Sequence, residues 1–143
     1  MSAEENKAIA RRFFEEVWNK GNLDVIDETH AAGYVLHDST GDIQGTEGLR
    51  QFVMVYLTAF PDFHVTIEDE IAEGDMVVLR WTVTGTHKGE LMGISPTDKE
   101  MTMTGITMGR IASGKIVEAW NNLDAVGMLQ QLGVIPTMGQ SEK

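Results

Sequence analysis

The stretch GITMGRIASGKIVEAWNNLDAVGMLQQLG, from Gly105 to Gly133, decides the fold class of this chain. Its first part, up to Ile111, combines β-branched and Met residues and is typical of a strand. The Ala-Ser-Gly-Lys sequence at 112–115 supplies a turn, and residues 116–123 return as a second strand. The stretch therefore predicts a β-hairpin, and the rest of the chain is interpreted around it.

A short helix is expected directly after this hairpin. Asp124 is placed to cap a helix over residues 125–132, because an Asp side chain accepts hydrogen bonds from the first free backbone N–H groups of a helix. Gly133 ends the helix, and Pro136 lies beyond it.

The returning strand carries polar residues on both of its faces. Side chains alternate along a strand, so Ala119 and Asn121 share one face, while Glu118, Trp120 and Asn122 share the other. Polar residues interleaved with a Trp on a strand that should be central indicate a pocket wall as well as core.

The 143-residue length indicates a single domain, residues 1–143, and the hydrophobic fraction of 42% is ordinary for a globular chain. The net charge of −11 makes nucleic acid and anionic membranes poor partners, because phosphate binding requires clustered Lys and Arg. No apolar run approaches the roughly 18 residues of a membrane helix. The N-terminus lacks the features of a signal peptide, so a cytoplasmic location is expected.

The residue types present also exclude several kinds of chemistry. The chain has no Cys, so disulfides, thiol catalysis and cysteine metal sites are excluded. The four His residues are scattered, and no two of them stand at a metal-ligand spacing. No metal site is therefore expected.

The rest of the sequence predicts mainly helices in its first part and strands in its second part. Helices are predicted over residues 2–20, 24–30 and 46–59, a short strand over 34–38, and further long strands over 63–72, 76–87 and 99–111. Residues 39–45 and 88–98 are expected as loops, and residues 140–143 as a frayed tail. Three helices against a twisted antiparallel sheet make an α+β fold, in which the space between helices and sheet can stay open as a cavity.

Six short segments, in order over nearly the whole chain, carry a resemblance to a known family. They are FFEEVWNKGN at 13–22, GTEGLR at 45–50, FPD at 60–62, TGTHKGE at 84–90, GKIVEAW at 114–120 and QQLG at 130–133. With these segments the chain resembles the SnoaL-like polyketide cyclase family of the nuclear-transport-factor-2-like superfamily.

The resemblance implies a cone-shaped barrel in which a curved antiparallel sheet wraps around three helices. It further implies a homodimer, an apolar pocket and no cofactor. Cyclases of this family close a ring by an intramolecular aldol step, in which a carboxylate on the last long strand takes a proton from the carbon nucleophile. The same scaffold also carries isomerases, dehydratases, epoxide hydrolases and non-catalytic binding modules, so the fold alone does not define the chemistry.

The chain departs from the family pattern at the position of that carboxylate. Family members often read Glu-His-Trp-Asp where this chain reads Glu-Ala-Trp-Asn at 118–121. Asn121 therefore stands in the place of the acid, and Asn cannot act as a general base at neutral pH. Its amide can still orient a carbonyl or an enolate oxygen.

Two His residues are the candidates for moving a proton. His87 ends a strand at a Gly-Thr-His-Lys-Gly turn, where a barrel rim would lie, although it can equally be a rim residue bonded to the loop. His37 and Asp38 are adjacent, so only one of them faces the pocket, and we predict that it is His37. The predicted catalytic residues are thus His37, His87 and Asn121.

The candidates for substrate binding are mostly aromatic. They are Trp18, Tyr56, Trp81, Trp120 and Asp124. For the aromatic residues core packing is an alternative interpretation, and for Asp124 the alternative is the helix cap described above.

Two functions are therefore left open. The first is an enzyme of the polyketide or ester cyclase type that performs cofactor-free acid–base chemistry, an aldol cyclisation or an isomerisation, on an apolar carbonyl compound. The second is a non-catalytic module that binds a small ligand or acts as a dimeric interaction domain, since the usual acid is missing at Asn121. Both expect an apolar small molecule as ligand and a homodimer.

Overall fold

The computed structural model describes residues 2–136, so the tail expected at 140–143 lies outside the described residues. Within this range the helices are α1 (Ala3–Arg12), the π-helix η1 (Phe13–Trp18), α2 (Val25–Thr29), α3 (Gly45–Ala59) and α4 (Ala125–Gln131). The strands are β1 (His30–Asp38), β2 (Gly41–Gln44), β3 (His64–Glu73), β4 (Met76–Thr86), β5 (Glu100–Ala112) and β6 (Lys115–Leu123).

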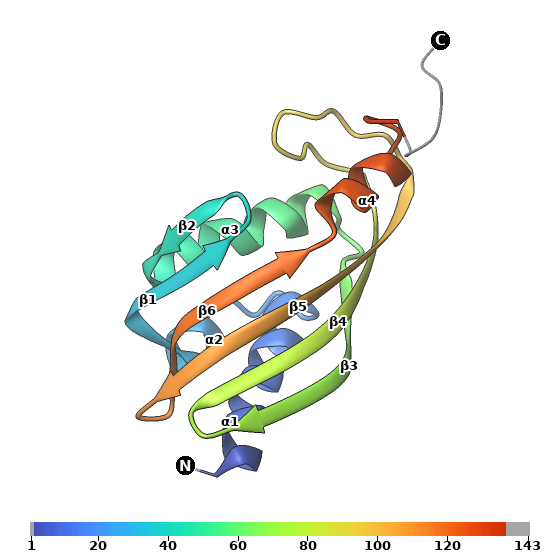
Figure 1. Cartoon of the computed structure of the whole chain (residues 1–143). Helices are drawn as coiled ribbons and strands as arrows, with labels where there is room; N and C mark the ends of the chain where they lie inside the picture. The colour runs from blue at the N-terminus through green and yellow to red at the C-terminus, as the bar shows by residue number, and fades with distance from the viewer. Residues whose placement is uncertain (1, 137–143) are drawn as a thin grey trace.

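All six strands form one sheet in the order β2-β1-β6-β5-β4-β3 (Figure 1). The four long strands β3 to β6 pair antiparallel, as predicted from the turns that join them. Strand β1, however, pairs parallel with β6. The sheet is therefore mixed rather than wholly antiparallel, and α3 and four strands, β2 to β5, intervene along the chain between β1 and its parallel partner.

The segment expected as a loop at 39–45 contains the edge strand β2, which pairs with β1 over Gly41 to Gln44. The prediction of a loop is wrong here because it relied on apolar alternation. An edge strand that is mostly exposed has no buried face to show in its sequence, and its backbone hydrogen bonds to β1 stabilise it instead.

The helices cover the concave face of the sheet, as Figure 1 shows for α1 and α3 behind the curved strands. Alternation along β4 follows the prediction, because Val77, Leu79, Trp81 and Val83 are each at most 5% exposed. Arg80, on the opposite face, is exposed and pairs with Asp69 of β3. The core therefore lies between the concave sheet face and the helices.

The first helix changes its winding halfway along. The prediction over residues 2–20 assumed one regular helix, but the chain continues from Arg12 as a π-helix to Trp18. The backbone N–H of Asn19 accordingly donates to the carbonyl of Phe14, five residues earlier. This wider turn presents Phe13, Phe14 and Trp18 to the interior, so the local irregularity directs aromatic side chains toward the centre of the molecule.

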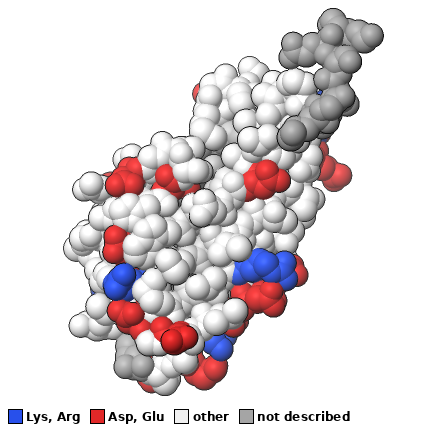
Figure 2. All heavy atoms as spheres, in the orientation of Figure 1, with Lys and Arg blue, Asp and Glu red and all other residues white. Residues whose placement is uncertain are grey.

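The surface charge is distributed rather than gathered. On the face shown in Figure 2, Lys and Arg side chains lie singly or in small groups beside Asp and Glu. Among the described residues, no helix is long and apolar enough to cross a membrane.

Candidate active site

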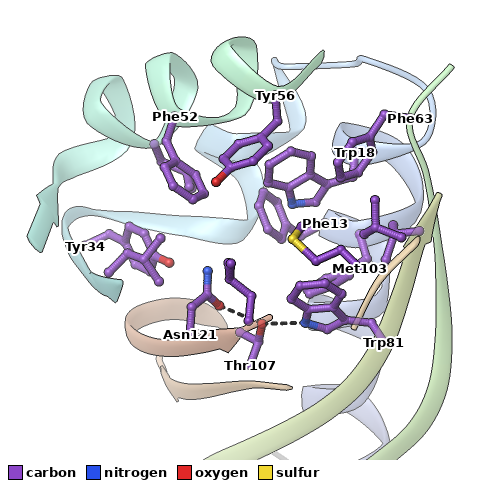
Figure 3. A pocket seen from close by; sticks show the side chains of 16 residues that line it. Phe13, Trp18, Tyr34, Phe52, Tyr56, Phe63, Trp81, Met103, Thr107 and Asn121 are labelled. Atoms are coloured by element: carbon purple, nitrogen blue, oxygen red, sulfur yellow. Dashed lines mark hydrogen bonds between the residues drawn. The ribbon is translucent and has the colours of Figure 1, made fainter. Parts of the chain in front are cut away.

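An apolar pocket lies between the helices and the concave face of the sheet (Figure 3). It contains about 560 Å³ of unfilled space, part of which is open to solvent. Its lining is dominated by aromatic and aliphatic side chains, namely Phe13, Phe14, Trp18, Tyr34, Leu36, Leu49, Phe52, Tyr56, Phe63, Val65, Trp81, Val83, Met103 and Leu123, together with the polar Thr107 and Asn121. The predicted Trp18, Tyr56, Trp81 and Asn121 therefore meet in one pocket.

A chain of hydrogen bonds across the sheet orients the amide of Asn121. The indole N–H of Trp81 donates to Thr107 Oγ1 at 2.9 Å, and the Thr107 hydroxyl donates to Asn121 Oδ1 at 2.7 Å. Because an indole N–H can only donate, the Thr107 oxygen is the acceptor there and its hydrogen is free for Asn121. The amide oxygen of Asn121 is thereby engaged, and its NH₂ group points into the pocket (Figure 3).

The nitrogen of the same amide has a neighbour on the next strand. Asn121 Nδ2 donates to Asp38 Oδ1 over a long distance of 3.4 Å, while Asp38 Oδ2 accepts from the backbone N–H and the hydroxyl of Thr40. A carboxylate can only accept, so this contact independently requires the amide nitrogen on that side. One N–H of Asn121 has no partner among the described residues and is available to a ligand oxygen.

Two phenols add further donors to the pocket. Burial raises the pKa of Tyr56 to about 12 and also raises that of Tyr34, with the negative charge of Asp38 as the second cause in both cases. Both side chains therefore stay protonated at neutral pH. In Figure 3 both hydroxyl groups point toward the interior of the pocket, where they can donate to a ligand.

His37 does not face the pocket, which corrects the prediction. Its ring stacks on Trp120 at 5.5 Å on the convex face of the sheet. Its Nε2 lies 2.7 Å from Glu118, and its Nδ1 lies 3.0 Å from Asp42. These two carboxylates, Glu118 first, raise the pKa of His37. The alternation argument was sound, but the wrong member of the pair was chosen, and Asp38 is the residue that points inward.

Trp120 is likewise excluded from the pocket. It pairs with Met108 of β5 and with His37 of β1 on the convex face, and the guanidinium of Arg110 lies 5.8 Å from its ring centroid. The prediction that Trp120 contacts substrate is corrected by strand alternation itself, since its neighbour Asn121 takes the inward position.

His87 is buried at the far end of β4 rather than at an open rim. Its side chain is 0% exposed, its Nδ1 accepts from the backbone N–H of Thr97 at 3.2 Å, and its ring lies 5.6 Å from Phe60. It does not line the pocket. The two Gly residues of the surrounding motif explain this packing: a Cβ on Gly85 would come within 2.9 Å of Phe60, and one on Gly89 would collide with the carbonyl at the end of α3. The motif thus brings the strand end tightly beneath α3.

Asp124 serves as the helix cap that the alternative interpretation describes. Its side chain accepts from the backbone N–H of Gly127 at 2.9 Å at the start of α4. Like His87, it is not among the residues that line the pocket.

A buried histidine that the sequence did not single out lies deeper. His30 is 2% exposed and packs edge-on against Phe13 and Tyr34, beside a second, smaller cavity. Thr29 Oγ1 donates to the carbonyl of Val25, so it accepts from His30 Nδ1, and the ring is the neutral Nδ1–H tautomer. Burial lowers the pKa of His30 to about 3.

The residues that sequence reasoning missed are Tyr34, Asp38 and Thr107. A partial signal existed for Tyr34 and Asp38, because both share one face of their strand with Leu36, while His37 lies on the other face. Tyr34 and Leu36 are bulky and buried, so this face is the one that would be expected to point inward. Thr107 carries no such signal, since Thr is common in strands on either face.

Within residues 2–136 no group of three or more His, Asp or Glu is placed to hold a metal ion. An apolar pocket enclosed between helices and the concave face of a curved mixed sheet defines the class of protein: an α+β cone with the nuclear-transport-factor-2-like fold, as the sequence predicted.

The family model for the SnoaL-like polyketide cyclases matches residues 8–132, and the chain belongs to this family. A proposed SnoaL-like polyketide cyclase from Jannaschia sp. CCS1 is 26% identical, with 94% of this chain and 95% of that chain covered and a TM-score of 0.87. IdmH, a proposed polyketide cyclase from Streptomyces antibioticus, is 33% identical, with coverages of 90% and 99% and a TM-score of 0.79.

A proposed polyketide cyclase from Acidithiobacillus ferrooxidans is 34% identical, covers 93% of this chain and 98% of its own, and has a TM-score of 0.81. No protein with a curated function matches the chain. Membership of the family implies a small-molecule substrate.

Proposed function

We propose that the chain is an enzyme that performs cofactor-free acid–base chemistry, an aldol cyclisation or an isomerisation, on an apolar carbonyl compound. The observation that carries this proposal is the amide of Asn121, whose N–H group points into an otherwise apolar pocket and whose orientation is fixed by Thr107 and Trp81. The pocket lining accepts the apolar body of the substrate, and the amide binds its carbonyl oxygen.

The role of Asn121 follows from where charge develops in such a reaction. When a proton leaves the carbon next to a carbonyl, the negative charge moves to the carbonyl oxygen. A donor that is already oriented toward that oxygen stabilises the enolate more than the neutral ketone, because no reorganisation is needed as the charge forms. The neutral hydroxyl groups of Tyr34 and Tyr56 are further donors in the same pocket.

Proton exchange in a simple ketone tests this proposal without knowledge of the natural substrate. The probe is 1-indanone, an apolar two-ring ketone, and the measurement is loss of its α-proton signal in D₂O by NMR. We expect exchange above the buffer rate for the wild-type protein, and a loss of about 100-fold in Asn121→Ala, the usual effect of removing an oxyanion donor.

The neighbouring residue offers a matched control. Asn122 lies on the opposite face of β6, where it pairs with Ile106 of β5, so Asn122→Ala should leave the exchange rate within about twofold of wild type, the usual effect of a surface change. Equal exchange by wild type and Asn121→Ala would contradict the proposal. Tight binding of the neutral phenol 2-naphthol without any exchange of 1-indanone would instead support the non-catalytic binding module.

We also propose that two copies associate through the convex face of the sheet. Val78, Met108, Trp120 and His37 form one row across four neighbouring strands of that face, and Ile106 beside them is 48% exposed. Apolar groups in such a row are better buried against a second copy than left in water. Sedimentation at micromolar concentration should give a dimer, and a monomer there would contradict this arrangement.

A further inference from the structure

We propose that Asp38 is the catalytic base of this pocket, so that the carboxylate absent from position 121 is supplied by the adjacent strand. This inference rests on the proposed function and adds the group that moves the proton. It is needed because His37 faces the convex side of the sheet and His87 is fully buried at the end of β4. Asp38 is not itself a lining residue, but its Oδ1 contacts the amide of Asn121, which lines the pocket.

The register of the sheet places Asp38 beside Asn121. Strands β1 and β6 run parallel, with Leu36 next to Ala119 and His37 next to Trp120. One residue further along, Asp38 and Asn121 reach the same level, and both point to the concave side, as the bond between their side chains shows. The acid and the oxyanion donor thus stand next to each other on neighbouring strands.

The two oxygens of the Asp38 carboxylate have different environments. Oδ2 accepts two hydrogen bonds from Thr40, one from its backbone N at 3.1 Å and one from its Oγ1 at 2.6 Å. These bonds hold the turn between β1 and β2. Oδ1 accepts only the 3.4 Å contact from Asn121. One oxygen therefore anchors the side chain, and the other keeps a lone pair for a proton.

Asp38 is nearly buried and has no cationic partner among the described residues. The residue is 9% exposed, and within residues 2–136 it forms no ion pair with Lys, Arg or His. Tyr34 and Tyr56 are the titratable groups close enough for its charge to act on them, and both stay neutral.

The proton transfer can be written with all atoms accounted for. Oδ1 of Asp38 takes a proton from the carbon next to the carbonyl, and the C–H electron pair forms a C=C bond while the carbonyl becomes an enolate held by the Asn121 N–H. In an isomerisation the Asp38 acid returns the proton to another carbon of the conjugated system. In an aldol closure the enolate carbon bonds to a second carbonyl carbon of the same molecule, and the resulting alkoxide takes the proton. Neither route needs a co-reactant.

The test compares Asp38→Asn with wild type in the 1-indanone exchange experiment. Asn retains an oxygen that can accept from Thr40, so the turn is preserved while the base is removed. We expect the saturated exchange rate to fall about 100-fold or more, as for loss of a general base, with little change in the ketone concentration at half-saturation. Binding of neutral 2-naphthol at pH 6 should stay within about threefold, since the contacts of the pocket lining are unchanged.

Chemical rescue and a turn variant separate a base from a merely structural residue. Formate added to Asp38→Gly should restore part of the exchange, because a small carboxylate can occupy the vacated position, and acetate should restore less. Ser39→Ala changes an exposed side chain of the same turn and should keep exchange within about twofold of wild type, since a surface substitution usually has a small effect.

The outcomes distinguish this inference from the proposed function. Full exchange by Asp38→Asn with loss in Asn121→Ala would overturn the role of Asp38 and leave the proposed function standing. A second result would also overturn the role of Asp38 as base: Asp38→Asn loses both exchange and 2-naphthol binding, and formate does not rescue Asp38→Gly. Asp38 would then only stabilise the fold. No exchange by the wild-type protein would contradict the proposed function and this inference together.

Discussion

The side chains of Asp38 and Asn121 contact each other at 3.4 Å although 83 residues separate them in the chain. Position 121 carries an amide where the family resemblance implies a carboxylate, and the adjacent parallel strand presents a carboxylate at the same level of the sheet. An acid at either position would contact the other residue of this pair, and the proposed acid–base chemistry rests on this contact.

Restoring the family acid should perturb both carboxyl groups. Asn121→Asp places two carboxylates in contact, and the repulsion between like charges should raise the pKa of one of them by more than about one unit. NMR titration of ¹³C-labelled Asp carboxyl carbons measures this shift. Asn122→Asp, on the convex face, is the control in which no such pair arises. Ordinary titration of every carboxyl in Asn121→Asp would show that Asp38 and residue 121 are not neighbours in solution.

Removing the hydroxyl of Thr107 should disconnect the amide of Asn121 from the sheet. Thr107→Val keeps the shape of the side chain but leaves the Trp81 N–H without its acceptor and Asn121 Oδ1 without its donor. We expect a loss of about 1–3 kcal/mol in the free energy of unfolding, measured in urea. Exchange of 1-indanone should also fall, by roughly tenfold, since the donor is no longer pre-oriented.

Thr104→Val provides the comparison for that experiment, because Thr104 is exposed and pairs with Thr82 on the same strand pair. Its unfolding free energy should change by less than about 0.5 kcal/mol. If both Val variants behave alike, the hydrogen-bond chain has no role in orienting Asn121.

His30 should make the protein sensitive to acid. Its pKa is about 3 in the folded protein and near ~6.5 when unfolded, so the unfolded chain takes up a proton first as the pH falls. The contribution of neutral His30 to the free energy of unfolding is therefore fully present above about pH 6.5. Below that pH the free energy of unfolding falls toward pH 3, by at most ~1.4 kcal/mol per pH unit.

His30→Asn keeps a donor for Thr29 without a titrating ring, and urea unfolding between pH 7 and pH 4 measures the difference. The gap in unfolding free energy between wild type and variant should narrow steadily below pH 6.5. Thr66→Asn, a change without a titrating group at an exposed position on β3, should give parallel curves. Parallel curves for His30→Asn as well would rule out a buried neutral imidazole.

His37 should act in the opposite direction. Glu118 and then Asp42 raise its pKa above the ordinary value, so the charged ring stabilises the fold below about pH 6.5. This contribution is lost as the pH rises through the raised pKa of the folded state. The difference in Tm between wild type and His37→Asn should therefore be largest near pH 5 and shrink by pH 9, and added salt should reduce it. A difference independent of pH would contradict the charged pairing.

Periodicity along the chain determined most of the secondary structure. The long strands β3 to β6 and helix α3 begin and end within one or two residues of the predicted ranges, because each buries one face and its sequence alternates accordingly. Local signals failed where no buried face exists, as at the edge strand β2, or where a backbone irregularity is involved, as in the π-helix of residues 13–18. Trp18, Tyr56, Trp81 and Asn121, four of the predicted site residues, line one pocket in the structure, and their role in binding or catalysis stays a prediction.

What the sequence by itself determined is thus the α+β class, the family and the fact that only one of two adjacent residues, His37 and Asp38, faces inward. Which of them does so was decided by the tertiary structure. The parallel pairing of β1 with β6 is a long-range contact, and its register sets the phase of β1 against the concave face. A shift of that register by one residue would exchange the histidine for the carboxylate. The alternation of Tyr34 and Leu36 gives only a partial signal for this phase, because the register depends on how the helices and the whole sheet pack together.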